Sequence, residues 1–73
     1  MYFAGIDIGS TMTKVVLTDE AGNLLSVIKG PTGAEHRQLA NEVMRRALEQ
    51  ASLEIDDISY IVATGYGRLN VPF

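Results

Sequence analysis

The sequence predicts an α/β fold in which a three-stranded antiparallel meander is followed by one helix and a parallel fourth strand. Three observations predict it. Residues 2–29 hold three runs rich in apolar and β-branched residues, separated by two short turns. Residues 34–52 repeat apolar positions at intervals of three and four, as an amphipathic helix does. Residues 59–64 form a further apolar run, and a strand reached through a helix runs parallel to one already in the sheet.

The first three strands are predicted from their turns. Residues 2–8 are almost continuously apolar, which indicates a central strand buried on both faces. Gly9-Ser10-Thr11-Met12 is short enough for a hairpin turn, so a second strand over residues 13–18 runs antiparallel to the first. Residues 19–23 form another turn, and a third strand follows over residues 24–29.

The helix is predicted over residues 34–52. Gly30 and Pro31 end the preceding strand, and Thr32 with Glu35 three residues later has the form of a capping box. The apolar positions that form one stripe are Leu39, Ala40, Val43, Met44, Ala47, Leu48 and Ala51. One face of the helix is therefore expected to pack on the sheet.

The fourth strand, over residues 59–64, again reads as buried on both faces, as does the first. A single helix covers only one face of a sheet, so the sequence predicts that one layer is missing. We therefore expect residues 1–73 to be the front piece of a larger α/β protein.

Composition excludes several classes of function. The 73 residues carry a net charge of -3, which argues against binding to a nucleic-acid backbone. Cysteine is absent, so the chain holds no disulfide, no thiolate metal site and no cysteine nucleophile. No apolar run is long enough to span a membrane, and no cationic stretch leads into a long apolar segment, so neither membrane spanning nor secretion is expected. We expect a cytoplasmic protein without nucleic-acid or membrane partners.

The candidate site is the run from Asp7 to Lys14. A charge buried without a partner is costly, so a cationic partner is expected beside Asp7. The backbone N–H groups of Gly9, Ser10 and Thr11 could cradle a phosphate, with Lys14 adding positive charge and Asp7 holding Mg2+ directly or through its waters. The alternative is an ordinary hairpin in which Asp7 caps a local amide and Lys14 lies at the surface.

A resemblance adds to these observations. The run from Asp7 to Lys14 is similar to the first phosphate loop of the superfamily that includes acetate and sugar kinases, heat-shock 70 chaperones and actin, which share a ribonuclease-H-like domain. Ala63-Thr64-Gly65-Tyr66-Gly67-Arg68 resembles a segment of the ATPases that activate 2-hydroxyacyl-CoA dehydratases and of related benzoyl-CoA reductase subunits. The resemblance covers residues 2–69. It implies that residues 1–73 are the N-terminal fragment of an actin-like ATPase nucleotide-binding domain.

The same resemblance implies ATP and Mg2+ as ligands, with Asp7 as the metal-positioning and catalytic residue. The nucleotide-binding residues that it implies are Gly9, Ser10, Thr11, Met12, Thr13 and Lys14. For the intact protein it implies ATP hydrolysis coupled to low-potential electron transfer, a [4Fe-4S] cluster shared by two identical subunits, and a dehydratase or reductase partner. These 73 residues contain no cysteine for the cluster and no second phosphate loop, so alone they are expected to be inactive.

Two other functions stay open. A sugar or other small-molecule kinase of the same superfamily would share the first loop, although the Tyr66-Gly67-Arg68 ending weighs against it. A non-enzymatic module would instead associate with a partner through an exposed sheet face. Gly65 and Gly67 also fit a tight exit from the fourth strand that makes no functional contact.

Overall fold

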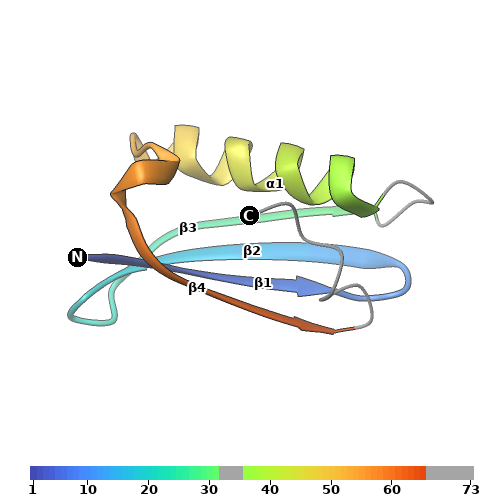
Figure 1. Ribbon diagram of the computed structural model, residues 1–73, viewed down its shortest axis with the longest axis horizontal. Coiled ribbons are helices and arrows are strands. Elements are labelled where there is room, and N and C mark those ends of the chain that lie inside the picture. The colour runs from blue at the N-terminus through green and yellow to red at the C-terminus, as the bar shows by residue number, and fades with distance from the viewer. Residues whose placement is uncertain (32–35, 66–73) are drawn as a thin grey trace.

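The computed structural model describes residues 1–31 and 36–65, which form two layers, a four-stranded sheet and one helix lying across it (Figure 1). Three strands come first in the chain, then the helix, a short 3-10 turn and the fourth strand. The α/β architecture predicted from the sequence is confirmed.

The first three strands form the predicted antiparallel meander. Their bounds are β1 Tyr2–Ile8, β2 Met12–Asp19 and β3 Leu24–Pro31. β2 and β3 are longer than predicted because their ladder continues until Met12 pairs with Pro31. Proline has no backbone N–H to donate to a neighbouring strand, so it disrupts a central strand. β3 accommodates Pro31 because this strand lies at an edge of the described sheet.

The helix α1 spans His36–Ala51 and packs over β1, β2 and β3. A 3-10 helix, η1 (Ile55–Asp57), leads into β4 (Ile58–Gly65), which pairs with β1 in parallel as predicted. The strand order is β3-β2-β1-β4. Thr32 and Glu35 of the predicted capping box lie outside the described residues. Within residues 1–31 and 36–65, no helix has the length and apolar character needed to cross a membrane.

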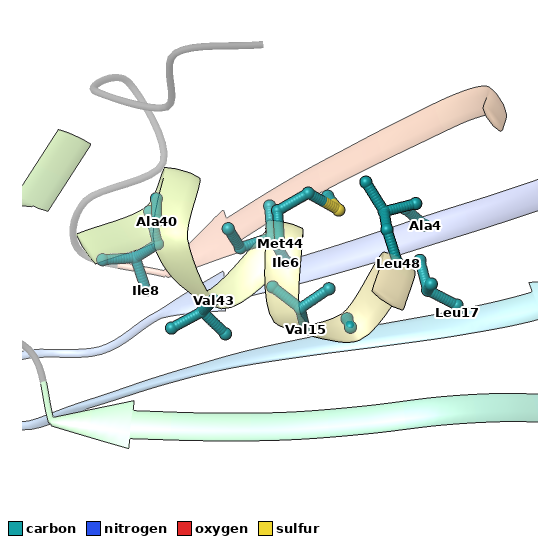
Figure 2. Packing of buried hydrophobic residues seen from close by; sticks show 10 residues of the cluster. Ala4, Ile6, Ile8, Val15, Leu17, Ala40, Val43, Met44 and Leu48 are labelled. Atoms are coloured by element: carbon teal, nitrogen blue, oxygen red, sulfur yellow. The ribbon is translucent and has the colours of Figure 1, made fainter. Parts of the chain in front are cut away.

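The core lies between α1 and the sheet (Figure 2). The sheet contributes Ala4, Ile6, Ile8, Val15 and Leu17, and the helix contributes Ala40, Val43, Met44, Ala47 and Leu48. The twofold period of the strands and the three-to-four spacing of the helix bring these two sets face to face. The predicted apolar stripe of the helix is thus confirmed for the side chains that the structure describes.

The face of the sheet opposite α1 is called the open face below. It is made of Phe3, Gly5 and Asp7 of β1, Met12, Lys14, Val16 and Thr18 of β2, Val27, Lys29 and Pro31 of β3, and Tyr60, Val62 and Thr64 of β4. Tyr60 is 64% exposed and Val62 is 50% exposed. The prediction that the first and fourth strands are buried on both faces is therefore wrong for this structure. One helix reaches one face, and every second side chain of a strand points to the other.

The turn between β2 and β3 is held by the Asp19 carboxylate. Its Oδ1 accepts hydrogen bonds from the backbone N–H groups of Ala21 and Asn23, both at 2.9 Å, and its Oδ2 accepts one from Asn23 Nδ2 at 3.0 Å. These bonds stabilise the charged form and lower the pKa of Asp19. Gly22 has φ of 86°, a conformation that glycine adopts without steric cost.

The residue that follows α1 has a left-handed backbone conformation although it is not glycine. Ser52 has φ of 58°, its N–H donates to the Glu49 carbonyl at 3.1 Å, and the Leu53 N–H donates to the Leu48 carbonyl at 2.9 Å. These two bonds form a Schellman motif, in which glycine is the preferred residue at the left-handed position.

Ser52→Gly is expected to stabilise the protein by about 0.5 to 1 kcal/mol because it removes the Cβ strain of the left-handed conformation. Urea unfolding measures the change. Gly22→Ala is the control of opposite sign: an added Cβ would have no atom within 4 Å, so only its φ of 86° opposes the substitution. We expect a loss of about 1 kcal/mol there. A destabilised Ser52→Gly protein would contradict the assignment of the cap.

Candidate functional site

The candidate site lies where β1 and β4 end and where the hairpin joins β1 to β2 (Figure 1). Strand register places four polar residues in one row across the open face. Lys29 pairs with Lys14, Lys14 with Asp7, and Asp7 with Thr64. Directly paired residues of neighbouring strands point to the same face, with Cβ atoms about 5 Å apart. The sheet thus brings together Asp7 and Lys14, which the sequence predicts as site residues.

The hairpin places two exposed amides next to this row. Gly9 N–H is already used, since it donates to the Met12 carbonyl at 2.8 Å. A Cβ on Gly9 would lie 3.0 Å from that same carbonyl oxygen, which explains why glycine stands here. Ser10 and Thr11 are exposed, and within the described part of the chain their N–H groups have no protein partner. Two of the three predicted phosphate-binding amides are therefore available to a ligand.

The side chain of Thr13, but not that of Met12, lies on the opposite face of the sheet from this arrangement. Thr13 is only 1% exposed and pairs with Ile8, so its side chain lies on the face of the sheet that α1 covers. Met12 is 49% exposed and follows the turn. The structure therefore does not bring the Thr13 side chain together with Asp7 and Lys14.

Asp7 is exposed and has one neighbour that the sequence does not predict. Thr64 Oγ1 donates a hydrogen bond to Asp7 Oδ1 at 3.3 Å. Neither Lys14 nor Lys29 forms an ion pair within 4 Å in residues 1–31 and 36–65. The expectation that Asp7 is buried and therefore needs a cationic partner is wrong: Asp7 is exposed, and its register neighbour Lys14 forms no direct ion pair with it.

A shallow hollow of about 210 Å³ opens on this part of the open face. Its polar end is formed by Asp7, Lys14 and Thr64, and its apolar end by Gly5, Val16 and Val62. Gly5 has no side chain, so the backbone of β1 forms the floor between two valines. The hollow thus adjoins the row formed by Lys14, Asp7 and Thr64 and is lined largely by apolar surface.

A larger hollow, of about 470 Å³, lies elsewhere, between α1 and the segment that leads to β4. It is lined by apolar side chains, among them Met44, Leu48 and Leu53, with Arg45 and Glu49 at its rim. Arg45 and Glu49 form an exposed ion pair at 3.0 Å. None of the predicted site residues lies in this hollow, so size alone does not locate the site.

Sequence reasoning missed Lys29 and the contact made by Thr64. Lys29 could have been found from the hairpin register, which sets it opposite Lys14. Like charges directly opposite each other destabilise a sheet, so this pair adds positive charge that an anion would neutralise. Thr64 and Gly65 end β4, whereas Tyr66, Gly67 and Arg68 of the second motif lie outside the described residues.

Solved structures of similar proteins agree with this fold. The crystal structure of (R)-2-hydroxyglutaryl-CoA dehydratase component A from Acidaminococcus fermentans superposes with a TM-score of 0.84 at 29% identity, over 94% of this chain and 26% of that one. The activator of 2-hydroxyisocaproyl-CoA dehydratase from Clostridium difficile, solved with bound ADPNP, gives a TM-score of 0.81 at 32% identity. That match covers 96% of this chain and 26% of the other.

Sequence comparisons lead to the same group of proteins. The activator of lactoyl-CoA dehydratase from Anaerotignum propionicum is 40% identical over 72 residues, which are 96% of this chain and 27% of that protein. The chain thus spans about a quarter of the length of the curated relatives that it matches. The model of the BadF/BadG/BcrA/BcrD ATPase family matches residues 4–73. The expected resemblance is confirmed, and the chain belongs to the BadF/BadG/BcrA/BcrD ATPase family.

Proposed function

We propose that residues 1–73 form the N-terminal part of an actin-like ATPase nucleotide-binding domain and that the β1–β2 hairpin binds the phosphates of ATP together with Mg2+. One observation carries the proposal: Asp7 and Lys14 pair across β1 and β2, next to the exposed amides of Ser10 and Thr11. A carboxylate for a hard cation and N–H donors for an anion thus share one end of the sheet. The ADPNP bound to the similar Clostridium difficile activator supports a nucleotide as the ligand.

The donors at this site suit Mg2+. This ion prefers oxygen ligands, keeps several waters, and is commonly held by one or two carboxylates together with phosphate oxygens. Asp7 supplies one exposed carboxylate. The described residues contain no cluster of three or more His, Cys, Asp or Glu side chains, so water and phosphate oxygens would complete the shell. When bound, Mg2+ neutralises charge on the phosphates.

The protein groups then have separate tasks. Asp7 holds the metal or orients the waters on it. The N–H groups of Ser10 and Thr11 bind phosphate oxygens, as backbone nests do. Lys14 adds a positive charge near the same oxygens, and Lys29 strengthens the local positive potential from the neighbouring strand. Together these groups would favour hydrolysis by stabilising the charge on the transferred phosphoryl group.

An iron-sulfur cluster does not fit these 73 residues. Clusters of this kind are held by cysteine thiolates, and the sequence has no cysteine. Ligands for a [4Fe-4S] cluster would have to come from outside residues 1–73.

We further propose that the intact protein activates a 2-hydroxyacyl-CoA dehydratase, or a benzoyl-CoA reductase, by coupling ATP hydrolysis to low-potential electron transfer. The support is that the relatives at 32% to 40% identity are activators of lactoyl-CoA, 2-hydroxyisocaproyl-CoA and (R)-2-hydroxyglutaryl-CoA dehydratases. A homodimeric state belongs to the same proposal.

The test is a titration of Mg-ATP into the intact 15N-labelled protein. We expect the amide signals of Ser10, Thr11 and Lys14 to shift in a Mg2+-dependent way, because the N–H groups of Ser10 and Thr11 and the side-chain ammonium of Lys14 lie next to the bound phosphates. Signals of the Asp19–Asn23 turn, at the opposite end of the β1–β2 hairpin, serve as the control and should stay in place. Free phosphate should accumulate. Unshifted hairpin signals would refute the site, and a phosphorylated small molecule in place of free phosphate would identify a kinase.

A further inference from the structure

Within the described residues, the second sequence motif reaches the candidate site through Thr64. β4 pairs with β1 in parallel, with Asp7 opposite Thr64, although 57 positions separate the two residues in sequence. Both lie on the open face, where Thr64 Oγ1 donates to Asp7 Oδ1 at 3.3 Å. One residue of the second motif thus contacts the carboxylate of the first motif.

The two neighbours of Asp7 affect it differently. Lys14, on the β2 side, forms no ion pair with it within 4 Å. Thr64, on the β4 side, makes the side-chain hydrogen bond to Asp7 that is found within the described residues. A β-branched residue has restricted χ1 freedom, so its hydroxyl is held in a defined direction. Thr64 is therefore the neighbour that can fix the orientation of the Asp7 carboxylate.

We propose that Thr64 is a positioning residue for Asp7. Its hydroxyl occupies Oδ1 and leaves Oδ2 to accept a hydrogen bond from a metal-bound water or to bind Mg2+ itself. This inference rests on the proposed function of the hairpin and assigns to Thr64 a task in it. Groups that orient a metal-binding side chain affect the metal affinity of the site without touching the metal.

A purely structural role for Thr64 makes a different prediction. Threonine is a good strand former, and β4 lies at an edge of the described sheet, where the residue could simply favour extended backbone. Valine has the same shape and equal or better strand propensity but cannot donate a hydrogen bond. Thr64→Val therefore removes the proposed task and keeps the structural one, while Thr64→Ser keeps the hydroxyl.

The experiment follows two readouts of the intact protein at increasing Mg2+ concentration: the ATP-induced shifts of the Ser10 and Thr11 amide signals, and phosphate release with ATP saturating. Thr64→Val should raise the Mg2+ concentration for half-maximal rate by about tenfold. This is the lower end of the usual range for such groups, because 3.3 Å is long for a hydrogen bond between two oxygens. Thr64→Ser should recover most of the wild-type Mg2+ dependence. The KM for ATP should change less than the requirement for Mg2+.

Thr18→Val is the matched control. It removes a threonine hydroxyl from the open face at the end of β2 that lies away from the β1–β2 hairpin, where Thr18 pairs with Phe3. This substitution should leave the Mg2+ dependence unchanged. Thermal unfolding of each variant shows whether β4 still folds. An unaltered Mg2+ requirement in Thr64→Val, or equal impairment in Thr64→Ser, would overturn the role of Thr64 while the proposed function stands. A wild-type protein that binds no Mg-ATP would overturn both.

Discussion

Asp7→Asn is expected to lower Mg2+-dependent ATP hydrolysis by the intact protein by about two orders of magnitude, with the fold unchanged. Asparagine has nearly the same shape but offers Mg2+ a neutral oxygen, so the negative charge that holds the metal is lost. A hundredfold loss corresponds to about 2.7 kcal/mol of transition-state stabilisation. Asp7 is exposed and lies outside the core, so its replacement should not unfold the protein. Phosphate release across a Mg2+ series measures the effect.

A matched control separates loss of the site from loss of charge in general. Asp56 is also exposed but lies in η1, whereas the hairpin is at the other end of β4. Asp56→Asn removes the same charge and should leave hydrolysis unchanged. Hydrolysis by Asp7→Asn at the wild-type rate would exclude Asp7 from the mechanism, whatever the behaviour of the control.

Ile6→Ala is expected to lower the free energy of unfolding by about 3 to 4 kcal/mol. Ile6 is 1% exposed and lies in the layer between β1 and α1 (Figure 2). Truncation removes buried apolar surface and leaves a cavity that the neighbouring strands cannot collapse around. For a small domain with a stability of about 5 kcal/mol, this is most of what keeps it folded. Urea unfolding followed by circular dichroism measures the difference.

Two milder substitutions set the scale for this result. Ile6→Val removes one methylene group and should cost about 1 kcal/mol. Val62→Ala lies on the open face, where the side chain is 50% exposed, and should change stability by no more than about 0.5 kcal/mol. Equal losses at Ile6 and Val62 would mean that the open face is packed as tightly as the core, contrary to the structure.

The order and type of the elements were predictable because the hydrophobic period changes along the chain. Runs rich in apolar and β-branched residues, separated by short turns, identify the meander, and the three-to-four spacing from Ala40 to Leu48 identifies the helix. The ends of β2 and β3 were less predictable, because Met12 and Pro31 belong to the strands only by pairing with each other. Burial on both faces was predicted from apolar continuity, which does not reveal whether a covering layer is present.

The candidate site was predictable only in part. Asp7 and Lys14 are joined by a tight hairpin, so their pairing follows from local sequence. The alternation of side chains along a strand also predicts that Thr13 is not a site residue. Thr13 directly precedes Lys14, so its side chain must point to the opposite face. The approach of Thr64 to Asp7 depends on the parallel register of β1 and β4, and no local pattern specifies that register.

The separation of 57 positions between Asp7 and Thr64 also sets an order of assembly. A hairpin closes a loop of a few residues, whereas bringing β4 beside β1 closes one that includes all of α1. The longer closure has the greater entropic cost and is slower. During folding, the β1–β2 hairpin, which holds the anion-binding groups, therefore forms early. The Thr64 hydroxyl reaches the Asp7 carboxylate only after the connection through α1 has brought β4 beside β1.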